Sequence, residues 1–85
     1  MKELSYTITD PEGIHARPAG ALVKEASKFE CNVTLTKDGK EANAKRIFGI
    51  MGLAAKKGET LLIRCDGPDE EEAMKHITAF LQENM

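Results

Sequence analysis

Three segments of the chain alternate apolar and polar residues with a period of two, and this pattern constrains the fold more than any other feature. The apolar positions are Leu4, Tyr6 and Ile8, then Cys31, Val33 and Leu35, and finally Leu61, Ile63 and Cys65. Successive side chains of a strand point to opposite faces, so each segment predicts a strand with one buried face. Strands of parallel sheets are apolar throughout because both faces are covered. The alternation therefore predicts a mostly antiparallel sheet with one wet face.

Turn and helix signals supply the remaining elements. The dipeptide Asp38-Gly39 is typical of a hairpin turn and predicts a fourth strand at residues 41–44. Residues 19–29 place apolar side chains at helical spacing, which predicts a helix with one buried stripe. A short helix is expected from Ile47 to about Lys57 and is ended by Gly58. Its inward-facing residues are expected to be Ile50, Leu53 and Ala54.

The last segment predicts a third helix. It follows the break at residues 66–68 and opens with acidic residues, which suit the positive end of a helix dipole. Its apolar stripe is expected at Ala73, Ile77, Phe80 and Leu81. The element order is then β-α-β-β-α-β-α. We predict an α+β fold, an open-faced β-sandwich with a four-stranded, mostly antiparallel sheet and three helices on one face. With 85 residues, the chain is expected to form a single domain over residues 1–85.

Charge and composition narrow the classes of function. The net charge of −2 conceals an asymmetry, because residues 66–85 carry six acids against Lys75 and residues 1–65 therefore carry +3. Without a dense basic patch or stacking aromatic residues, nucleic-acid binding is not expected, whereas a local basic surface could meet an acidic protein. The first residues contain no apolar run, so neither a signal peptide nor membrane insertion is expected. We expect a cytoplasmic protein.

The cysteines and histidines do not predict a metal site. Cys31 and Cys65 lie in the predicted strands and are interpreted as buried free thiols, with a disulfide as the alternative. No metal-ligand spacing relates them to His15 or His76. His76 is interpreted as a surface histidine on the last helix, because no acidic or basic residue is found at a sequence spacing that indicates an interaction with it.

One histidine stands in a chemically suggestive setting. A turn at residues 10–13 is followed by His15, and Pro18 comes three positions later. Proline has no N–H to donate, so it fits the first turn of a helix, where backbone donors have no intrahelical partner. A histidine before a helix is often only a cap or a surface residue, which is the alternative interpretation.

The residues around His15 favour an anion at this helix start. The N–H groups of Ala16 and Arg17 are expected to be free there, and a helix N-terminus with free donors binds phosphate well. Histidine titrates near neutral pH and can act as a nucleophile. Together these features describe a histidine that can carry a phosphoryl group, with the arginine beside it.

Residues 13–19, Gly-Ile-His-Ala-Arg-Pro-Ala, resemble the active-site signature of HPr, the histidine phosphocarrier family of the bacterial phosphoenolpyruvate:sugar phosphotransferase system. Residues 45–51, Lys-Arg-Ile-Phe-Gly-Ile-Met, match a second motif of the family, and the resemblance covers essentially the whole chain. It implies that His15 accepts a phosphoryl group on Nδ1 from phosphorylated enzyme I and passes it to a histidine of a sugar-specific IIA component. Arg17 would stabilise the charge of the phosphoryl group. The resemblance implies a monomeric carrier without a cofactor, not an enzyme in its own right.

A docking surface for both partners is expected around the second motif. Ile47, Phe48 and Met51 have no obvious core to enter, and an exposed apolar patch usually marks an interaction site. The alternative is that a thin core absorbs all three. Lys24 and Lys28 each fall within roughly 20° of Arg17 on a helix, either as solvated charges or as part of the docking surface.

Arg46 is a departure from part of the family. In HPr proteins of low-GC Gram-positive bacteria this position is a serine that a dedicated kinase phosphorylates, so that regulation is in doubt here. Arginine also replaces a good N-cap residue and places positive charge at the unfavourable end of a helix. Our hypothesis is that Arg46 instead strengthens docking to acidic partners. The resemblance implies that Arg17, Lys24 and Arg46 form the charged rim of the docking surface. Two further alternatives are an HPr-like binding module that carries no phosphate and a domain that binds a phosphorylated metabolite, which would need an enclosed pocket.

Overall fold

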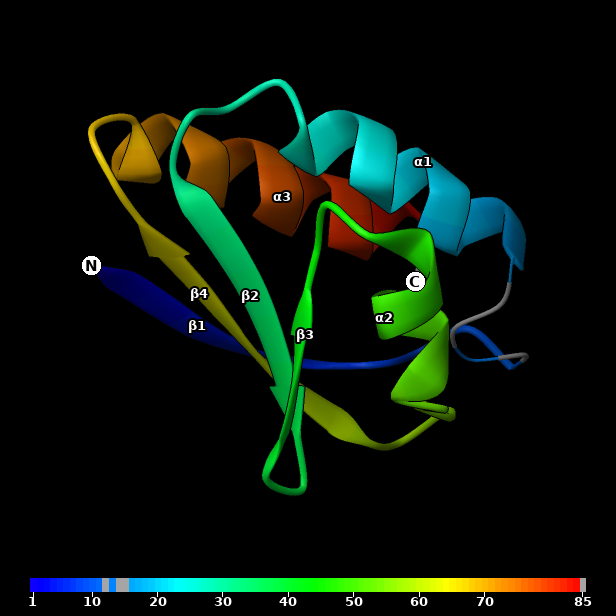
Figure 1. Ribbon diagram of the computed structural model, residues 1–85. Helices are drawn as coiled ribbons and strands as arrows, with labels where there is room; N and C mark the ends of the chain where they lie inside the picture. The colour runs from blue at the N-terminus through cyan, green and yellow to red at the C-terminus, as the bar shows by residue number, and fades with distance from the viewer. Residues whose placement is uncertain (12, 14–15, 85) are drawn as a thin grey trace.

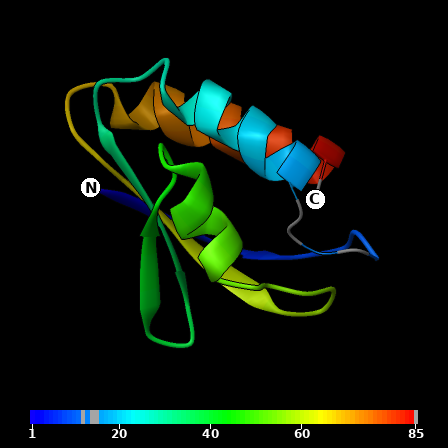
Figure 2. The same cartoon turned by 45° about the vertical axis from the view of Figure 1, so that its right-hand side comes forward.

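The protein has the predicted order of strands and helices. The computed structural model describes residues 1–11, 13 and 16–84, with Ala16 and Arg17 in backbone only. The elements are β1 (Lys2–Thr7), α1 (Ala16–Ala26), β2 (Asn32–Lys37), β3 (Lys40–Asn43), α2 (Ile47–Gly52), β4 (Thr60–Asp66) and α3 (Glu70–Asn84). All three helices lie on one face of the sheet (Figures 1 and 2). The predicted open-faced α+β sandwich is confirmed.

The four strands form one sheet in the order β1-β4-β2-β3, and every neighbouring pair is antiparallel. The register aligns the apolar positions in rows across the strands. In one row, Ile63 of β4 lies opposite Leu4 of β1 and Leu35 of β2, and Leu35 lies opposite Ala42 of β3. Because side chains in a row share a face, this register assembles a continuous apolar surface for the helices.

The core lies between this surface and the helices. It contains Ala19, Leu22 and Ala26 of α1 and Ala73, Ile77 and Leu81 of α3, all fully buried. Phe80, which was expected in the same stripe, is only partly buried against the core. Each large side chain that leaves water here contributes about 1.5–3 kcal/mol. The helices therefore stabilise the domain mainly through this packing.

The two cysteines are buried free thiols, as predicted. Burial together with the Asp69 carboxylate raises the pKa of Cys31 to about 12. Burial also raises the pKa of Cys65. Both sulfurs therefore stay protonated at neutral pH, and a thiol is a poor nucleophile and a poor metal ligand.

The helix α2 is shorter than the sequence predicts, which corrects the expected end at Gly58. The helix ends at Gly52, and Leu53 is its C-cap. Ala54 then adopts a left-handed conformation with φ +51 and is exposed, so its expected place in the core is wrong. The bend instead buries Ala55, and a continuous helix would have carried that residue out of the core.

His76 is a surface residue on α3, as expected, but it has acidic neighbours that the sequence interpretation missed. Its Nε2 lies 3.4 Å from Oε2 of Glu72, one turn earlier on the same helix, and its Nδ1 lies 3.9 Å from Oε1 of Glu25 on α1. The His76 ring also lies 5.4 Å from that of Phe29. Spacing alone could have identified Glu72, whereas Glu25 is brought there by the packing of α1 on α3.

None of the helices in the described part of the chain has the length and apolar character needed to cross a membrane. Within the same residues, no three His, Cys, Asp or Glu side chains are grouped closely enough to hold a metal ion.

Candidate functional site

The motif at residues 13–19 enters the described part of the structure through Gly13. Its N–H donates to the carbonyl oxygen of Asp10 at 2.9 Å and closes the predicted turn. Gly13 has φ +68, and a β-carbon there would lie 2.4 Å from the carbonyl oxygen of Ala55. Only glycine allows this approach of two backbones. The turn therefore rests on the loop that follows α2. His15 lies outside the described residues, so its role stays a prediction.

The helix α1 begins at Ala16, directly after His15 in the sequence. Pro18 is the third residue of this helix and is buried, which confirms its predicted place in the first turn. The first four N–H groups of a helix have no intrahelical acceptor, and the first turn of α1 contains no acidic side chain. The backbone at Ala16 and Arg17 is therefore the positive end of a helix dipole, as an anion site requires. The Arg17 side chain lies outside the described part of the structure, so its role stays a prediction.

The short helix α2 divides its side chains between core and solvent. Ile50 is fully buried, whereas Phe48 is 85% exposed and Met51 is 39% exposed. The alternative that a thin core absorbs this whole apolar group is therefore wrong for Phe48 and Met51. A phenylalanine this exposed gains almost nothing from folding, and an exposed apolar patch is typical of an interaction site.

Ile47 departs from the expectation of an exposed side chain. It is half-buried and packs against the core. Gly20 of α1 lies beneath it, because a β-carbon on Gly20 would meet Cδ1 of Ile47 at 3.6 Å. Since Gly20 has no side chain, Ile47 can fill the space between the two helices. It thereby packs the start of α2 against α1.

Arg46 occupies the N-cap position of α2 with extended backbone angles, φ −129 and ψ 114. Its side chain makes no capping hydrogen bond and is exposed, which agrees with the expected loss of a cap. The Arg46 N–H donates instead to the carbonyl oxygen of Asn43 at 3.0 Å. Neither Arg46 nor Lys24, exposed in the last turn of α1, forms an ion pair with a described residue. Both charges are available to a partner.

The basic line on α1 is interrupted by the end of the helix. Because α1 ends at Ala26, Lys28 does not continue the line through Lys24, and its Nζ pairs with Oε2 of Glu25 at 3.2 Å. Lys45, which the sequence interpretation did not single out, donates from Nζ to the carbonyl oxygen of Phe29 at 2.7 Å. Lysines commonly satisfy the free carbonyls beyond a helix end. This bond ties the segment before α2 to the end of α1.

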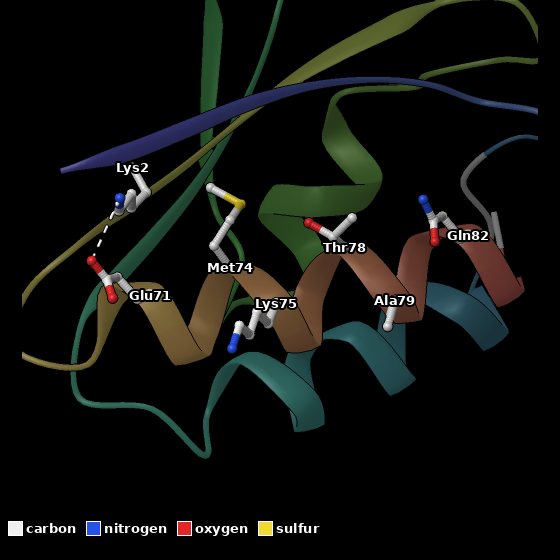
Figure 3. Close-up of a pocket in the computed structure, with 7 residues that line it drawn as sticks. All are labelled: Lys2, Glu71, Met74, Lys75, Thr78, Ala79 and Gln82. Carbon is white, nitrogen blue, oxygen red and sulfur yellow. Dashed lines mark ion pairs between the residues drawn. The ribbon is translucent and has the colours of Figure 1, made fainter.

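A groove lies along β1 and α3 and contains none of the predicted site residues. It is lined by Lys2, Glu71, Met74, Lys75, Thr78, Ala79 and Gln82 (Figure 3). The ion pair of Lys2 Nζ with Glu71 Oε1, at 3.5 Å, lies at one end. The groove is wide open to solvent, whereas a metabolite site needs an enclosed pocket. It therefore gives no support to a metabolite-binding domain.

Comparison with known proteins identifies the family. A family model described as the PTS HPr component phosphorylation site matches residues 2–83. The phosphocarrier protein HPr of Mycoplasma genitalium is 45% identical over 85 residues, which cover 99% of this chain and 97% of that protein. HPr-C-His from Thermoanaerobacter tengcongensis has a crystal structure that superposes with a TM-score of 0.93 at 41% identity, covering 98% of this chain and 93% of that one. An HPr dimer from the same organism superposes with a TM-score of 0.78 at 41% identity and covers 98% and 95% of the two chains. By sequence and by fold, this chain belongs to the HPr family of phosphocarrier proteins of the phosphotransferase system.

Proposed function

We propose that His15 accepts a phosphoryl group from phosphorylated enzyme I and passes it to a histidine of a sugar-specific IIA component. Nδ1 attacks phosphorus as the bond to the donor histidine breaks, and a second transfer to the acceptor regenerates the free ring. The chain is then a carrier with a covalent intermediate and needs no cofactor. The observation that carries the proposal is the exposed apolar face of α2, with Phe48 85% exposed, beside α1, whose first turn contains the end of the motif.

The start of α1 suits the transferring group electrostatically. Fixed N–H dipoles at Ala16 and Arg17 stabilise developing negative charge without reorganisation, and the Arg17 guanidinium adds a full positive charge. Pro18 fixes the first turn from which these N–H groups point. The stabilisation has to favour the transition state over the phosphorylated carrier, because a carrier that binds its phosphoryl group too tightly stops donating it.

Both partners would use one docking surface, which we define as Arg17, Lys24, Arg46, Ile47, Phe48 and Met51. The exposed rings and methyl groups of Phe48 and Met51 supply apolar contacts, and Ile47 supports them from its half-buried place over Gly20. The cations form the rim and attract an acidic partner, which raises the encounter rate more than the affinity. A surface of this kind suits the small, transient interfaces of a relay.

We further propose that the working form is a cytoplasmic monomer. A single docking surface has to be free for two successive partners, and a dimer that covered α2 would block both. Size-exclusion chromatography with light scattering tests this directly. If the wild type were a stable dimer and the Phe48→Glu variant a monomer, the docking surface would serve self-association instead.

Intact-protein mass after incubation with enzyme I, Mg²⁺ and phosphoenolpyruvate tests the carrier function. The wild type should gain one acid-labile, alkali-stable phosphoryl group, and His15→Ala should gain none. His76→Ala is the matched control, because it removes the other histidine and should still be labelled. Labelling of His15→Ala would move the acceptor elsewhere. No labelling of the wild type, by an enzyme I that charges a known HPr, would favour the binding-module alternative.

A further inference from the structure

The loop at residues 53–59, which we call the platform loop, supports the turn that leads into the motif. Its residue Ala55 is buried and presents a carbonyl oxygen to Gly13. Its far end is tied to the end of β1, because Gly58 N–H donates to the Ile8 carbonyl at 2.9 Å and Ile8 N–H donates to the Glu59 carbonyl at 2.9 Å. The path of this loop therefore sets where Gly13 can lie.

The path is an unfavourable one for the backbone. Ala54 has φ +51, a left-handed conformation that costs an ordinary residue about 1–2 kcal/mol. Such a conformation persists only when surrounding contacts fix it. The burial of Ala55 is one such contact. The second comes from a different part of the fold.

Lys37, the last residue of β2, reaches across to the platform loop. Its side chain is only 14% exposed, and its Nζ lies 3.1 Å from Oε2 of Glu59. The same Nζ donates to the carbonyl oxygen of Ala54 at 3.3 Å. One ammonium group thus binds both ends of the bend. Charge-assisted hydrogen bonds of this kind are stronger than neutral ones.

Glu59 completes the arrangement from inside the loop. Its Oε1 accepts the N–H of Lys56 at 2.7 Å, and its own N–H donates to the Lys56 carbonyl at 3.0 Å. The Lys56 N–H and the Lys37 ammonium hold the pKa of Glu59 below its usual value. The carboxylate is therefore ionised at neutral pH and bound on both oxygens.

We infer that Lys37 and Glu59 are positioning residues for phosphoryl transfer, because their ion pair holds the platform loop in the bent path that supports the Gly13 turn. Neither residue touches the phosphoryl group. They act through Ala54, Ala55 and Gly13. The inference rests on the proposed function for its effect on transfer, but the effect on the turn itself can be measured without any transfer.

Three variants test the inference against one control. Lys37→Met removes the charge and keeps much of the stem, Glu59→Gln removes the partner charge, and Lys37→Arg restores a cation. Lys40→Met is the control, because Lys40 is exposed on the same hairpin and forms no ion pair with a described residue. All four are compared at a temperature where urea unfolding shows the variants to be folded.

We expect Lys37→Met and Glu59→Gln to lower the rate of phosphorylation by saturating enzyme I by roughly tenfold to a hundredfold, since small misplacements of reacting groups have effects of this size. Affinity for unphosphorylated enzyme I should stay within about twofold of the wild type. Lys37→Arg should recover most of the rate. A double variant that combines Lys37→Met with Glu59→Gln should be no slower than Lys37→Met alone, because both changes break one interaction.

Hydrogen exchange of the Gly13 amide measures the stability of the turn and does not depend on phosphoryl transfer. The Gly13 N–H should exchange faster in Lys37→Met and Glu59→Gln than in the wild type and Lys40→Met. Unchanged exchange and an unchanged rate in folded Lys37→Met would overturn the inference. A wild type that is never phosphorylated would instead overturn the proposed function, and the exchange data would still decide whether the ion pair holds the turn.

Discussion

Gly13 faces the carbonyl group of Ala55 so closely that a β-carbon on Gly13 would lie 2.4 Å from the Ala55 oxygen and 2.8 Å from the Cα of Lys56. The contact joins the turn before α1 to the loop after α2, which are distant in the sequence. Because both sides of the contact are backbone, neither can move aside cheaply. The turn that leads into the motif is therefore fixed against the loop that follows α2.

The Gly13→Ala variant should lower the free energy of unfolding by about 2–4 kcal/mol, because it combines a positive φ with a steric clash. Gly39→Ala is the matched control. Gly39 also has a positive φ, +81, but a β-carbon there would meet nothing within 4 Å. That variant should lose only about 1–2 kcal/mol, the backbone cost alone. Urea unfolding of both variants measures the difference, and equal losses would contradict the clash.

The Ala54→Gly variant should raise the free energy of unfolding by about 0.5–1 kcal/mol. Glycine adopts the left-handed conformation of Ala54, φ +51, without the steric penalty, although it adds entropy to the unfolded chain. The same substitution at Ala79, exposed within α3, should instead cost about 1 kcal/mol. Thermal and urea unfolding provide the comparison. A loss of stability in Ala54→Gly would show that the strain is not relieved.

Stability should decline in acid partly through Asp69. Its carboxylate accepts the Glu30 N–H at 2.8 Å and the Cys31 N–H at 2.9 Å, and these donors hold its pKa below the usual value. The ionised Asp69 carboxylate contributes fully to the free energy of unfolding above the unfolded-state pKa of about 3.9. This contribution is lost as the pH falls through the lower folded-state pKa. Asp69→Asn should therefore be less stable than the wild type at pH 7.

The difference between Asp69→Asn and the wild type should shrink as the pH falls below about 4 and both carry a neutral side chain. Urea unfolding from pH 2.5 to pH 7 measures it. Asp66→Asn is the control, because the Asp66 carboxylate is exposed and lies 3.9 Å from the N-terminal amine. If the difference in the free energy of unfolding between Asp69→Asn and the wild type did not depend on pH, the loss of stability would come from altered geometry and not from the lost charge.

Phe48→Ala should separate docking from folding. Because Phe48 is 85% exposed, its truncation should change the free energy of unfolding by less than about 0.5 kcal/mol. The second-order rate of phosphorylation by enzyme I should fall by roughly tenfold or more, as for an apolar anchor at an interface. Ile50→Ala, on the buried side of the same helix, should instead lose about 2–5 kcal/mol of stability. An unchanged rate in Phe48→Ala would remove it from the docking surface.

Arg46→Ser should stabilise the protein and weaken docking at once. Serine can cap α2, which Arg46 does not, so the free energy of unfolding should rise by about 0.5–1 kcal/mol. Loss of the positive charge should slow phosphorylation and make its rate less dependent on salt. Lys75→Ser removes the same charge from α3 and should leave the salt dependence unchanged. If Arg46→Ser also left it unchanged, the docking role of Arg46 would be abandoned.

Most of the fold follows from local patterns in the sequence. The alternation at residues such as Leu35 and Ile63 predicted strands with one buried face, and Asp38-Gly39 predicted the hairpin, where both residues have positive φ. Pro18 predicted the first turn of α1. These predictions hold because each depends on backbone geometry and on side-chain period, which are properties of a few neighbouring residues.

The exposure of the α2 side chains was predicted only in part, because exposure depends on what lies opposite a side chain. Phe48 and Met51 remain outside the core as expected, but Ile47 is half-buried because α1 presents a glycine, Gly20, at the point of contact. The end of α2 was misplaced for a similar reason. The sequence pattern continued to Gly58, whereas α2 ends at Gly52 and the chain turns at Ala54, where Ala55 is buried and Lys37 Nζ donates to the Ala54 carbonyl.

The sequence by itself determined the element order, the buried face of the three alternating strands and the helix start that contains Pro18, since these follow from residue type and spacing. Only the tertiary structure decided that Gly13 rests on Ala55, that Ile47 packs on Gly20 and that Lys37 binds the loop after α2. Each of these contacts joins segments that are far apart in the chain. Their existence depends on how the helices and the hairpin pack around one core, which no local pattern contains.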